Sequence, residues 1–181
     1  TAIRRQRQMC IRDRILSDVK DIINNDKKGS FSYNISNTDR SVGANVSGEI
    51  ASKYGEDGLS GSLNLNFMGS AGQSFGCWNA NGLNITLNGD ANDYVGKGMN
   101  GGKIIIKNDA DFAINDEKTI LAGNTCLYGA TGGEVYISGS VGERFAVRNS
   151  GAKAVIEGAG DHCCEYMLSL IHISEPTRHL L

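Results

Sequence analysis

The stretch GNTCLYGATGGEVYISGSVGERFAVRNSGAKAVI, Gly123 to Ile156, decides the fold because it holds one pattern twice. Each half has a glycine, a polar residue, a short predicted strand, a turn of small residues and a second, β-branched strand. The halves begin at Gly123 and Gly142, 19 residues apart, and another copy begins 18 residues later at Gly160. A repeat near this length indicates stacked units that cover each other's apolar faces. We therefore predict an all-β fold, a right-handed parallel β-helix (solenoid).

An earlier copy begins at Gly89 and is stretched to 34 residues by NDADFAINDEKT, residues 108–119. Its glycines spell G-x-G-x-x-G around Lys97, but a dinucleotide loop needs a helix after the glycines. The β-branched run that follows, Lys103 to Lys107, predicts a strand, so no nucleotide site is expected. We interpret the glycines as structural, at corners that need a positive φ or close backbone contact. They are Gly96, Gly98, Gly101, Gly102, Gly129, Gly132, Gly133 and Gly151.

One helix is predicted before the coils. ILSDVKDIINNDKK, Ile15 to Lys28, has apolar residues at helical spacing, and Gly29 follows as a stop signal. From residue 30 to 167 short β-branched runs alternate with Gly, Asn and Asp, the pattern of strands joined by turns. Matching positions of the repeats predict a shared core, which consists of Ile104, Ile106, Val135, Ile137, Val147 and Val155.

The two ends of the chain differ from the rest. MCIRDR, residues 9–14, back-translates to DNA whose reverse complement encodes LSLIHI, residues 168–173. We therefore interpret residues 1–14 and 168–181 as translated sequencing-adapter DNA and expect them to be disordered. The native domain is then residues 15–167.

Charge and hydropathy disfavour a nucleic-acid partner and a membrane span. Without the two tails, 12 of the 18 basic and 18 of the 20 acidic residues remain, for a net charge near −6. The remaining Lys and Arg are scattered along the chain without a basic patch, which disfavours a nucleic-acid partner. No apolar run is long enough to span a membrane and no signal peptide is present, so we expect a soluble, cytoplasmic protein.

No catalytic or metal site is predicted. Cys77, Cys126, Cys163 and Cys164 lack metal-ligand spacing, and the adjacent pair is expected to point to opposite faces of a strand. For the same reason His162 is interpreted as structural rather than as a base for a cysteine. β-Helix enzymes that cleave polysaccharides cluster carboxylates on one face. The acids that could form such a cluster are Asp90, Asp93, Asp161 and Glu165.

Three blocks carry a resemblance to a known family. NTDRSVGANVSGEIA (residues 37–51), the glycine-rich run 69–106 and the run 123–167 resemble the C-terminal domain of the glutamate synthase large subunit. That domain is a β-helix named for its repeated G-x-G-x-G pattern. The resemblance also implies that the last coils of the domain are missing after Met167. A related β-helix module of formylmethanofuran dehydrogenase is the nearest alternative, but it usually lacks the first block. An independent carbohydrate-active β-helix is a further alternative.

The resemblance implies a non-catalytic scaffold within an oxidoreductase of ammonia assimilation and glutamate biosynthesis. Glutamate synthase converts glutamine and 2-oxoglutarate to two glutamates. Its FMN, iron–sulfur cluster and nucleophilic cysteine are expected outside this segment, so no cofactor is expected here. The implied partners are the amidotransferase and FMN domains of the same chain and a small NADPH-oxidising subunit. The electron donor is NADPH or ferredoxin, and the resemblance favours the bacterial NADPH type.

Overall fold

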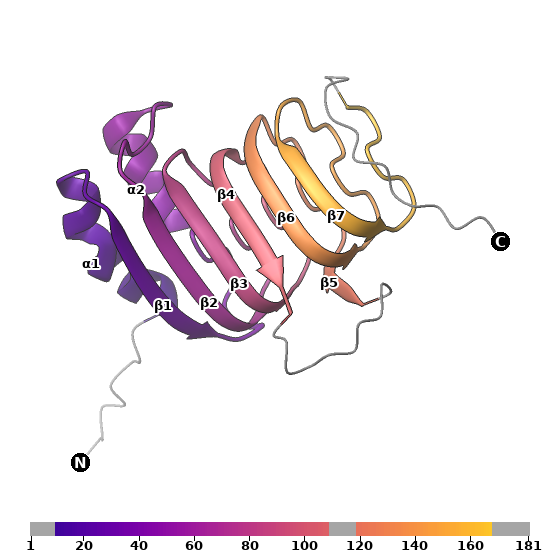
Figure 1. Cartoon of the computed structure of the whole chain (residues 1–181), viewed down its shortest axis with the longest axis horizontal. Coiled ribbons are helices and arrows are strands. Elements are labelled where there is room, and N and C mark those ends of the chain that lie inside the picture. The colour runs from indigo at the N-terminus through magenta and orange to yellow at the C-terminus, as the bar shows by residue number, and fades with distance from the viewer. Residues whose placement is uncertain (1–9, 109–118, 168–181) are drawn as a thin grey trace, which may run out of the picture.

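The computed structural model describes residues 10–108 and 119–167, and its main feature is a parallel β-sheet. The strands lie in the order β1-β2-β3-β4-β6-β5, with β7 also beside β6. Figure 1 shows them crossing the molecule side by side from indigo to yellow. The described strands are β1 (Gly29–Ile35), β2 (Leu63–Ala71), β3 (Leu83–Ala91), β4 (Asn100–Lys107), β5 (Ile120–Ala122), β6 (Gly132–Val141) and β7 (Lys153–Ala159).

Inward-facing side chains form columns because the strands pair in matched register through the middle of the sheet. Alternate residues of a strand face the same side, so every second residue enters the core. One column contains Leu65, Ile85, Ile104 and Val135, and the next contains Phe67, Leu87, Ile106 and Ile137. All eight side chains are buried.

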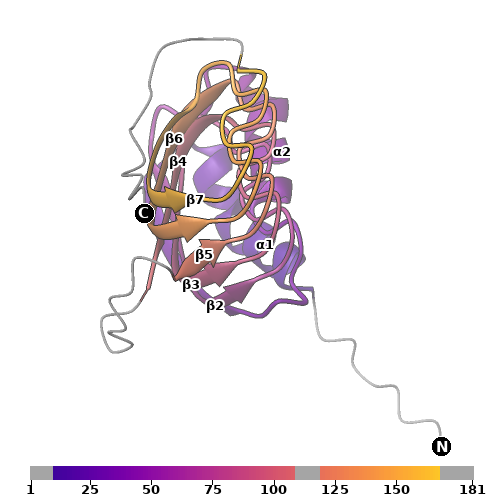
Figure 2. The ribbon, with the colours of Figure 1, turned by 90° about the vertical axis from the view of Figure 1, so that its right-hand side faces the viewer.

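Turn segments form a second wall opposite the sheet, as the end-on view of Figure 2 shows. The five segments are residues 74–78, 94–98, 125–129, 144–148 and 162–166. The second residue of each of the first four, Phe75, Val95, Cys126 and Phe145, is buried in the same core as the strand side chains. The core therefore lies between the sheet and the turn wall.

Two helices lie at the N-terminal end of the stack (Figure 1), where the sequence predicted one. Helix α1 spans Ile11–Asn24, against the predicted 15–28. It ends at Asn24, where the Asn25 side-chain amide donates to the Asp21 carbonyl oxygen at 3.0 Å and Asp26 adopts a left-handed φ of 48°. Its first four residues belong to the predicted adapter tail. Residues 1–9 and 168–181 of the two tails lie outside the described residues.

Helix α2 spans Ala44–Tyr54, a stretch for which the sequence analysis predicted no helix, so the all-β prediction was incomplete. Val46 and Ile50, four residues apart, are buried, and Gly55 follows with a positive φ. Ser47 and Gly48 weakened this signal because neither residue favours a helix. Tyr54 donates its hydroxyl to the Ile23 carbonyl at 2.5 Å, so α2 is tied to α1.

Each repeat unit contains fewer strands than the two that the sequence predicted. Each unit has one long strand, and the expected first strand of each unit is a turn segment, so CLY of 126–128 is not extended. One unit was predicted to begin at Gly89, but Gly89 lies inside β3. The turn that opens this unit begins at Asn92, whose N–H donates to the Ala71 carbonyl. The equivalent corner of the next unit is Gly123, whose N–H donates to the Ala91 carbonyl. Most of the insertion 108–119 lies outside the described residues.

Val155 was assigned to the core and this was wrong. Its side chain is 53% exposed, because Val135 and Ile137 pair with Ala154 and Ile156 and leave Val155 opposite Tyr136 on the outward face. Val147 is buried but lies outside the core cluster. The other predicted core residues, Ile104, Ile106, Val135 and Ile137, are at most 3% exposed.

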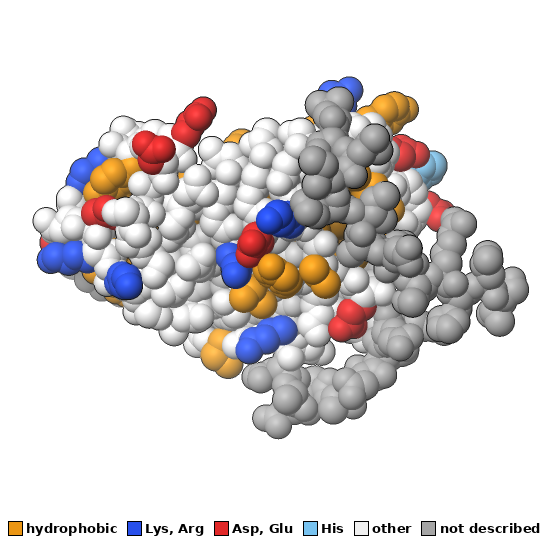
Figure 3. Space-filling model, turned by 45° about the horizontal axis from the view of Figure 1, so that its top comes forward, with side chains coloured by type: hydrophobic (Ala, Val, Ile, Leu, Met, Phe, Trp, Pro, Cys, Tyr) orange, Lys and Arg blue, Asp and Glu red, His pale blue; other side chains and the backbone are white. Residues whose placement is uncertain are grey.

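The outward face of the sheet carries a small apolar group, seen with charged neighbours in Figure 3. Tyr136 is 38% exposed and pairs in register with Ile105 on one side and Val155 on the other. The Lys103 ammonium lies 5.4 Å from the Tyr136 ring centroid and 3.1 Å from the Glu134 carboxylate. This exposed ion pair contributes little stability, about 0–1 kcal/mol.

Candidate functional site

The turn wall has an unusual backbone in which every second residue is left-handed. In the third segment φ is 57° at Thr125, 57° at Leu127 and 63° at Gly129. Residues other than glycine adopt this conformation at a cost of roughly 1–2 kcal/mol. The positions in the other four segments are Ser74, Gly76 and Trp78; Tyr94, Gly96 and Gly98; Arg144, Ala146 and Arg148; and His162, Cys164 and Tyr166.

This alternation aims successive N–H groups in opposite directions along the stack. Leu127 donates to Val95 of the preceding segment at 2.7 Å, whereas Thr125 and Gly129 donate to Glu143 and Val147 of the following unit at 2.7 and 3.0 Å. The neighbouring segments repeat the rule. Their backward donors are Gly76, Gly96, Ala146 and Cys164, and their forward donors are Ser74, Trp78, Tyr94, Gly98, Arg144 and Arg148.

These hydrogen bonds compensate for the strained backbone. Each is of ordinary length and contributes about 1 kcal/mol net, comparable to the cost of one left-handed residue. A side-chain pair at the corner of the stack adds to them. The Asp93 carboxylate accepts the Asn124 N–H at 2.8 Å, and the Asn124 amide oxygen accepts the Glu143 N–H at 2.8 Å.

The predicted structural glycines fall into two groups. In one group φ is positive, and in the other a Cβ would collide with a neighbouring unit. At Gly151, for example, a Cβ would run into the Thr131 carbonyl. The first group is Gly96, Gly98, Gly102, Gly129 and Gly133, and the second is Gly101, Gly132 and Gly151.

Sequence reasoning missed the non-glycine members of the turn wall. It assigned such conformations to glycine alone, whereas Thr125, Leu127, Arg144 and Ala146 share them. An alignment of the units on the turn segments would have found them, because glycine stands at the third position in two segments and the fifth in two.

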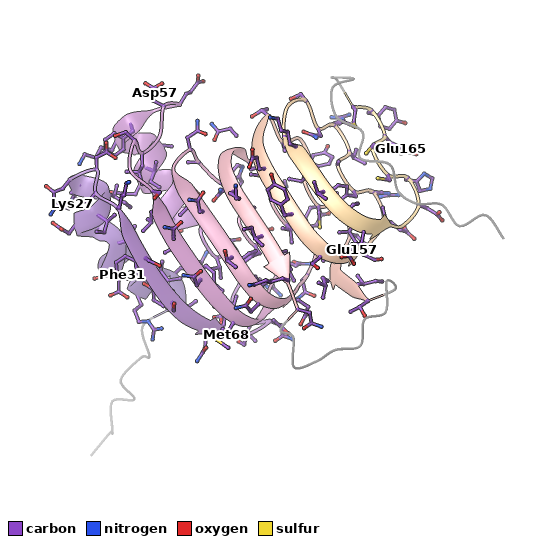
Figure 4. All side chains as sticks on the ribbon, viewed as in Figure 1. Lys27, Phe31, Asp57, Met68, Glu157 and Glu165 are labelled. Carbon is purple, nitrogen blue, oxygen red and sulfur yellow. The ribbon has the colours of Figure 1, made fainter. Side chains whose placement is uncertain are left out.

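An open groove of about 590 Å³ lies on the turn wall. The Lys97 ammonium lies 5.4 Å from the Tyr94 ring centroid in its lining. Glu165, the one acid among the described residues that line the groove, is labelled in Figure 4 on the segment after β7. The groove is lined by Tyr94, Lys97, Thr125, Tyr128, Arg144, Val147, Arg148, Glu165 and Tyr166.

The acids proposed for a carbohydrate enzyme have separate surroundings. Asp90 accepts a hydrogen bond from the Ser70 hydroxyl at 2.7 Å on the sheet, whereas Asp93 holds the corner described above. Glu165 lies 2.6 Å from His162 Nδ1, and Asp161 accepts the Arg144 N–H through its backbone carbonyl. Among residues 10–108 and 119–167 there is no group of three or more His, Cys, Asp or Glu that could hold a metal ion.

The cysteines form two classes. Cys77 and Cys126 are buried, and burial raises the pKa of both thiols, that of Cys126 to about 12. Cys163 and Cys164 were expected on opposite faces of a strand, which is wrong, because they lie in a turn segment and their sulfur atoms are 3.4 Å apart. The left-handed φ of 61° at Cys164 brings the two side chains to the same side.

Parallel strands and turn segments that both pair unit over unit define a domain of stacked strand-and-turn repeats. The sequence profile described as "GXGXG motif" matches residues 12–170, and the chain belongs to this family.

The chain is also similar to segments of ferredoxin-dependent glutamate synthases. It is 57% identical over 150 residues to ferredoxin-dependent glutamate synthase 2 of Synechocystis, a match that covers 83% of this chain and 10% of the relative. The chloroplastic ferredoxin-dependent glutamate synthase of Oryza sativa is 55% identical over 150 residues, a match that covers 83% of this chain and 9% of the relative. The ferredoxin-dependent glutamate synthase of Pyropia yezoensis is 58% identical over 135 residues, which covers 75% of this chain and 9% of the relative. The chain therefore spans about a tenth of these relatives.

Two expectations change in the light of these relatives. Their names state ferredoxin as the electron donor, so the preference for an NADPH-type enzyme with a small NADPH-oxidising subunit has no support. The rice relative is named as chloroplastic, so a cytoplasmic location does not follow from the relatives. In the described part of the chain, no helix has the length and apolar character needed to span a bilayer.

Proposed function

We propose that this chain is a non-catalytic scaffold segment of a ferredoxin-dependent glutamate synthase. The complete enzyme would convert glutamine and 2-oxoglutarate to two glutamates with reduced ferredoxin, through FMN and an iron–sulfur cluster held by other domains of the same chain. The observation that carries the proposal is the identity of 57% over 150 residues to the Synechocystis relative. The turn wall supports a scaffold role, because the positive-φ residues of its first four segments all donate backbone N–H groups to neighbouring units.

We also propose that the strands and turns close into the coils of a β-helix. Matched strand register on one wall and matched turn hydrogen bonds on the other support a right-handed parallel β-helix. The right hand is the usual one for a connection between parallel strands of one sheet. Small-angle scattering of the domain, compared with profiles of closed coils and of an open sheet, distinguishes the two shapes. A profile that matched the open sheet would contradict the β-helix.

The first test of the scaffold role is an activity assay of the isolated chain and the complete gene product. Both receive glutamine, 2-oxoglutarate and reduced ferredoxin, and FMN is measured by absorbance. We expect glutamate production and bound FMN in the complete protein and neither in the isolated chain. Turnover by the isolated chain, or none by the complete protein, would overturn the proposal.

A second test addresses His162 and Glu165, which form an acid–base contact at 2.6 Å. In the complete enzyme we expect His162→Ala and Glu165→Gln to leave turnover per bound FMN within about twofold of the wild type. A general acid or base would lose roughly 10²–10⁴-fold. A loss of that size in folded variants would show that this segment takes part in the chemistry.

The tail assignment also remains a proposal. The shared DNA source of residues 9–14 and 168–173 supports it, although α1 includes residues 11–14. Resequencing of the source DNA is the test, and a continuous native reading frame through both junctions would overturn it.

A further inference from the structure

The last described turn segment carries two thiols side by side. Cys163 and Cys164 have their sulfur atoms 3.4 Å apart, close enough for one S–H to point at the other sulfur. Cys163 is half-buried and packs against the core, whereas Cys164 is exposed. At the position of Cys164 the two preceding units have Leu127 and Ala146, which are buried. Within the described part of the chain, the Cys164 thiol is exposed.

The backbone holds this pair in place. The Cys164 N–H donates to the Phe145 carbonyl at 2.7 Å, the same backward bond that the equivalent residue makes in each earlier unit. This bond and the positive φ of Cys164 fix the backbone of the turn that carries the two thiols.

The geometry suits one ligand that binds both sulfurs rather than a disulfide. Neighbouring Cα atoms are about 3.8 Å apart across a trans peptide bond, nearer than the roughly 4.4–6.8 Å of ordinary disulfides. A central atom about 2.3 Å from each sulfur, as in metal thiolates, would close an S–X–S angle of about 95° at the observed 3.4 Å separation. Pyramidal trivalent arsenic prefers an angle close to a right angle.

Ions that need more ligands are less suitable. Structural zinc takes four protein ligands, and the described residues hold no group of three or more His, Cys, Asp or Glu that could bind a metal ion. A monosubstituted trivalent arsenical needs only two sulfurs, because its third substituent is its own carbon group.

We propose that Cys163 and Cys164 form a vicinal dithiol site that captures monosubstituted trivalent arsenicals, a role beyond the scaffold function. Two S–H bonds and the arsenic–oxygen bond of an arsine oxide break, two arsenic–sulfur bonds form, and one water leaves. Neither sulfur nor arsenic changes its oxidation state. Cys77 and Cys126 are buried and do not compete, and Cys10 is exposed but has no second thiol beside it among the described residues.

The reactive form of the pair is available near neutral pH. The hydrogen bond from Cys163 lowers the pKa of Cys164 to about 7, and the same hydrogen bond raises that of Cys163. The pair therefore carries one thiolate, which begins the attack, and one thiol, which completes the ring. The neighbouring His162 and Glu165 pair with each other.

The test is native mass spectrometry of the folded chain with phenylarsine oxide and an excess of glutathione, a monothiol that displaces single-sulfur adducts. We expect one adduct, removed by 2,3-dimercaptopropanol, with unchanged occupancy in Cys10→Ser. Occupancy should fall at least tenfold in Cys164→Ser and in Cys163→Ser, each checked for folding by circular dichroism. Should the half-buried Cys163→Ser variant not fold, Cys164→Ser decides alone. No adduct on the wild type, or full occupancy in folded Cys164→Ser, would overturn the proposal.

Discussion

Trp78 lies over Gly98 of the next unit, and a Cβ placed on Gly98 would come within 2.9 Å of the indole Cδ1. The two residues are the fifth positions of adjacent turn segments, and both have a positive φ, 55° and 63°. Gly129 is the equivalent residue one unit later, with the same φ of 63°, and nothing lies within 4 Å of the site of its missing Cβ. The stack therefore contains a natural pair of glycines that differ only in what covers them.

Gly98→Ala is expected to destabilise the chain more than Gly129→Ala. Both substitutions put an alanine in the left-handed region, which costs roughly 1–2 kcal/mol. Only Gly98→Ala also displaces Trp78. Residues in contact typically have an interaction energy of about 0.5–1 kcal/mol or more, so we expect Gly98→Ala to cost that much more than Gly129→Ala. Urea unfolding of the two variants measures the difference. In the Trp78→Ala background the two glycine substitutions should cost the same, and a persistent difference would contradict the contact.

Ile137→Ala is expected to cost roughly 2–5 kcal/mol because it empties a core position that is 3% exposed. Val155→Ala on the adjacent strand is the matched control. Its side chain is 53% exposed, so the change should stay within about 0.5 kcal/mol. Equal midpoints for the two variants in a urea melt would show that the register between β6 and β7 is wrong.

Asp26 should make stability depend on pH in the acid range. Its carboxylate accepts hydrogen bonds from the Ser60 hydroxyl and, at 3.1 Å, from the Gly61 N–H, and the bond from Ser60 holds the pKa of Asp26 below its usual value. A lowered folded-state pKa contributes stability above the unfolded pKa of about 3.9 and loses it as pH falls through the folded value.

Asp26→Asn removes this titration but keeps a residue that tolerates the left-handed φ of 48°. We expect wild type to be more stable than Asp26→Asn at about pH 6, with the difference shrinking below about pH 4. Thermal unfolding at several pH values measures it. A difference that grows on acidification would have the wrong sign.

Alkylation should detect the thiolate of Cys164. Because the hydrogen bond from Cys163 lowers the pKa of Cys164 to about 7, its reaction with iodoacetamide should reach half its maximal rate near that pH. In Cys163→Ala the midpoint should move up toward the ordinary thiol value of about 8.5. Peptide mapping separates Cys164 from Cys10. The same midpoint in both proteins would show that Cys163 has no influence.

The local sequence determined that the chain repeats and which residues of β4 and β6 enter the core. Ile104, Ile106, Val135 and Ile137 could be predicted because strands alternate with a period of two, so β-branched residues at matching positions face one side. Val155 failed because AVI of 154–156 contains three apolar residues in a row, and alternation within such a run has two phases. Only pairing with β6 selected Ala154 and Ile156.

The tertiary structure alone decided the turn wall and everything that depends on it. Thr125, Leu127 and Arg144 have no intrinsic preference for a positive φ, and they adopt it because the unit before or after offers a carbonyl to their N–H groups. The same stacking placed the sulfur atoms of Cys163 and Cys164 together where an extended strand would have separated them. These hydrogen bonds join residues of different units, which are distant in the chain. A short stretch of sequence therefore does not predict them.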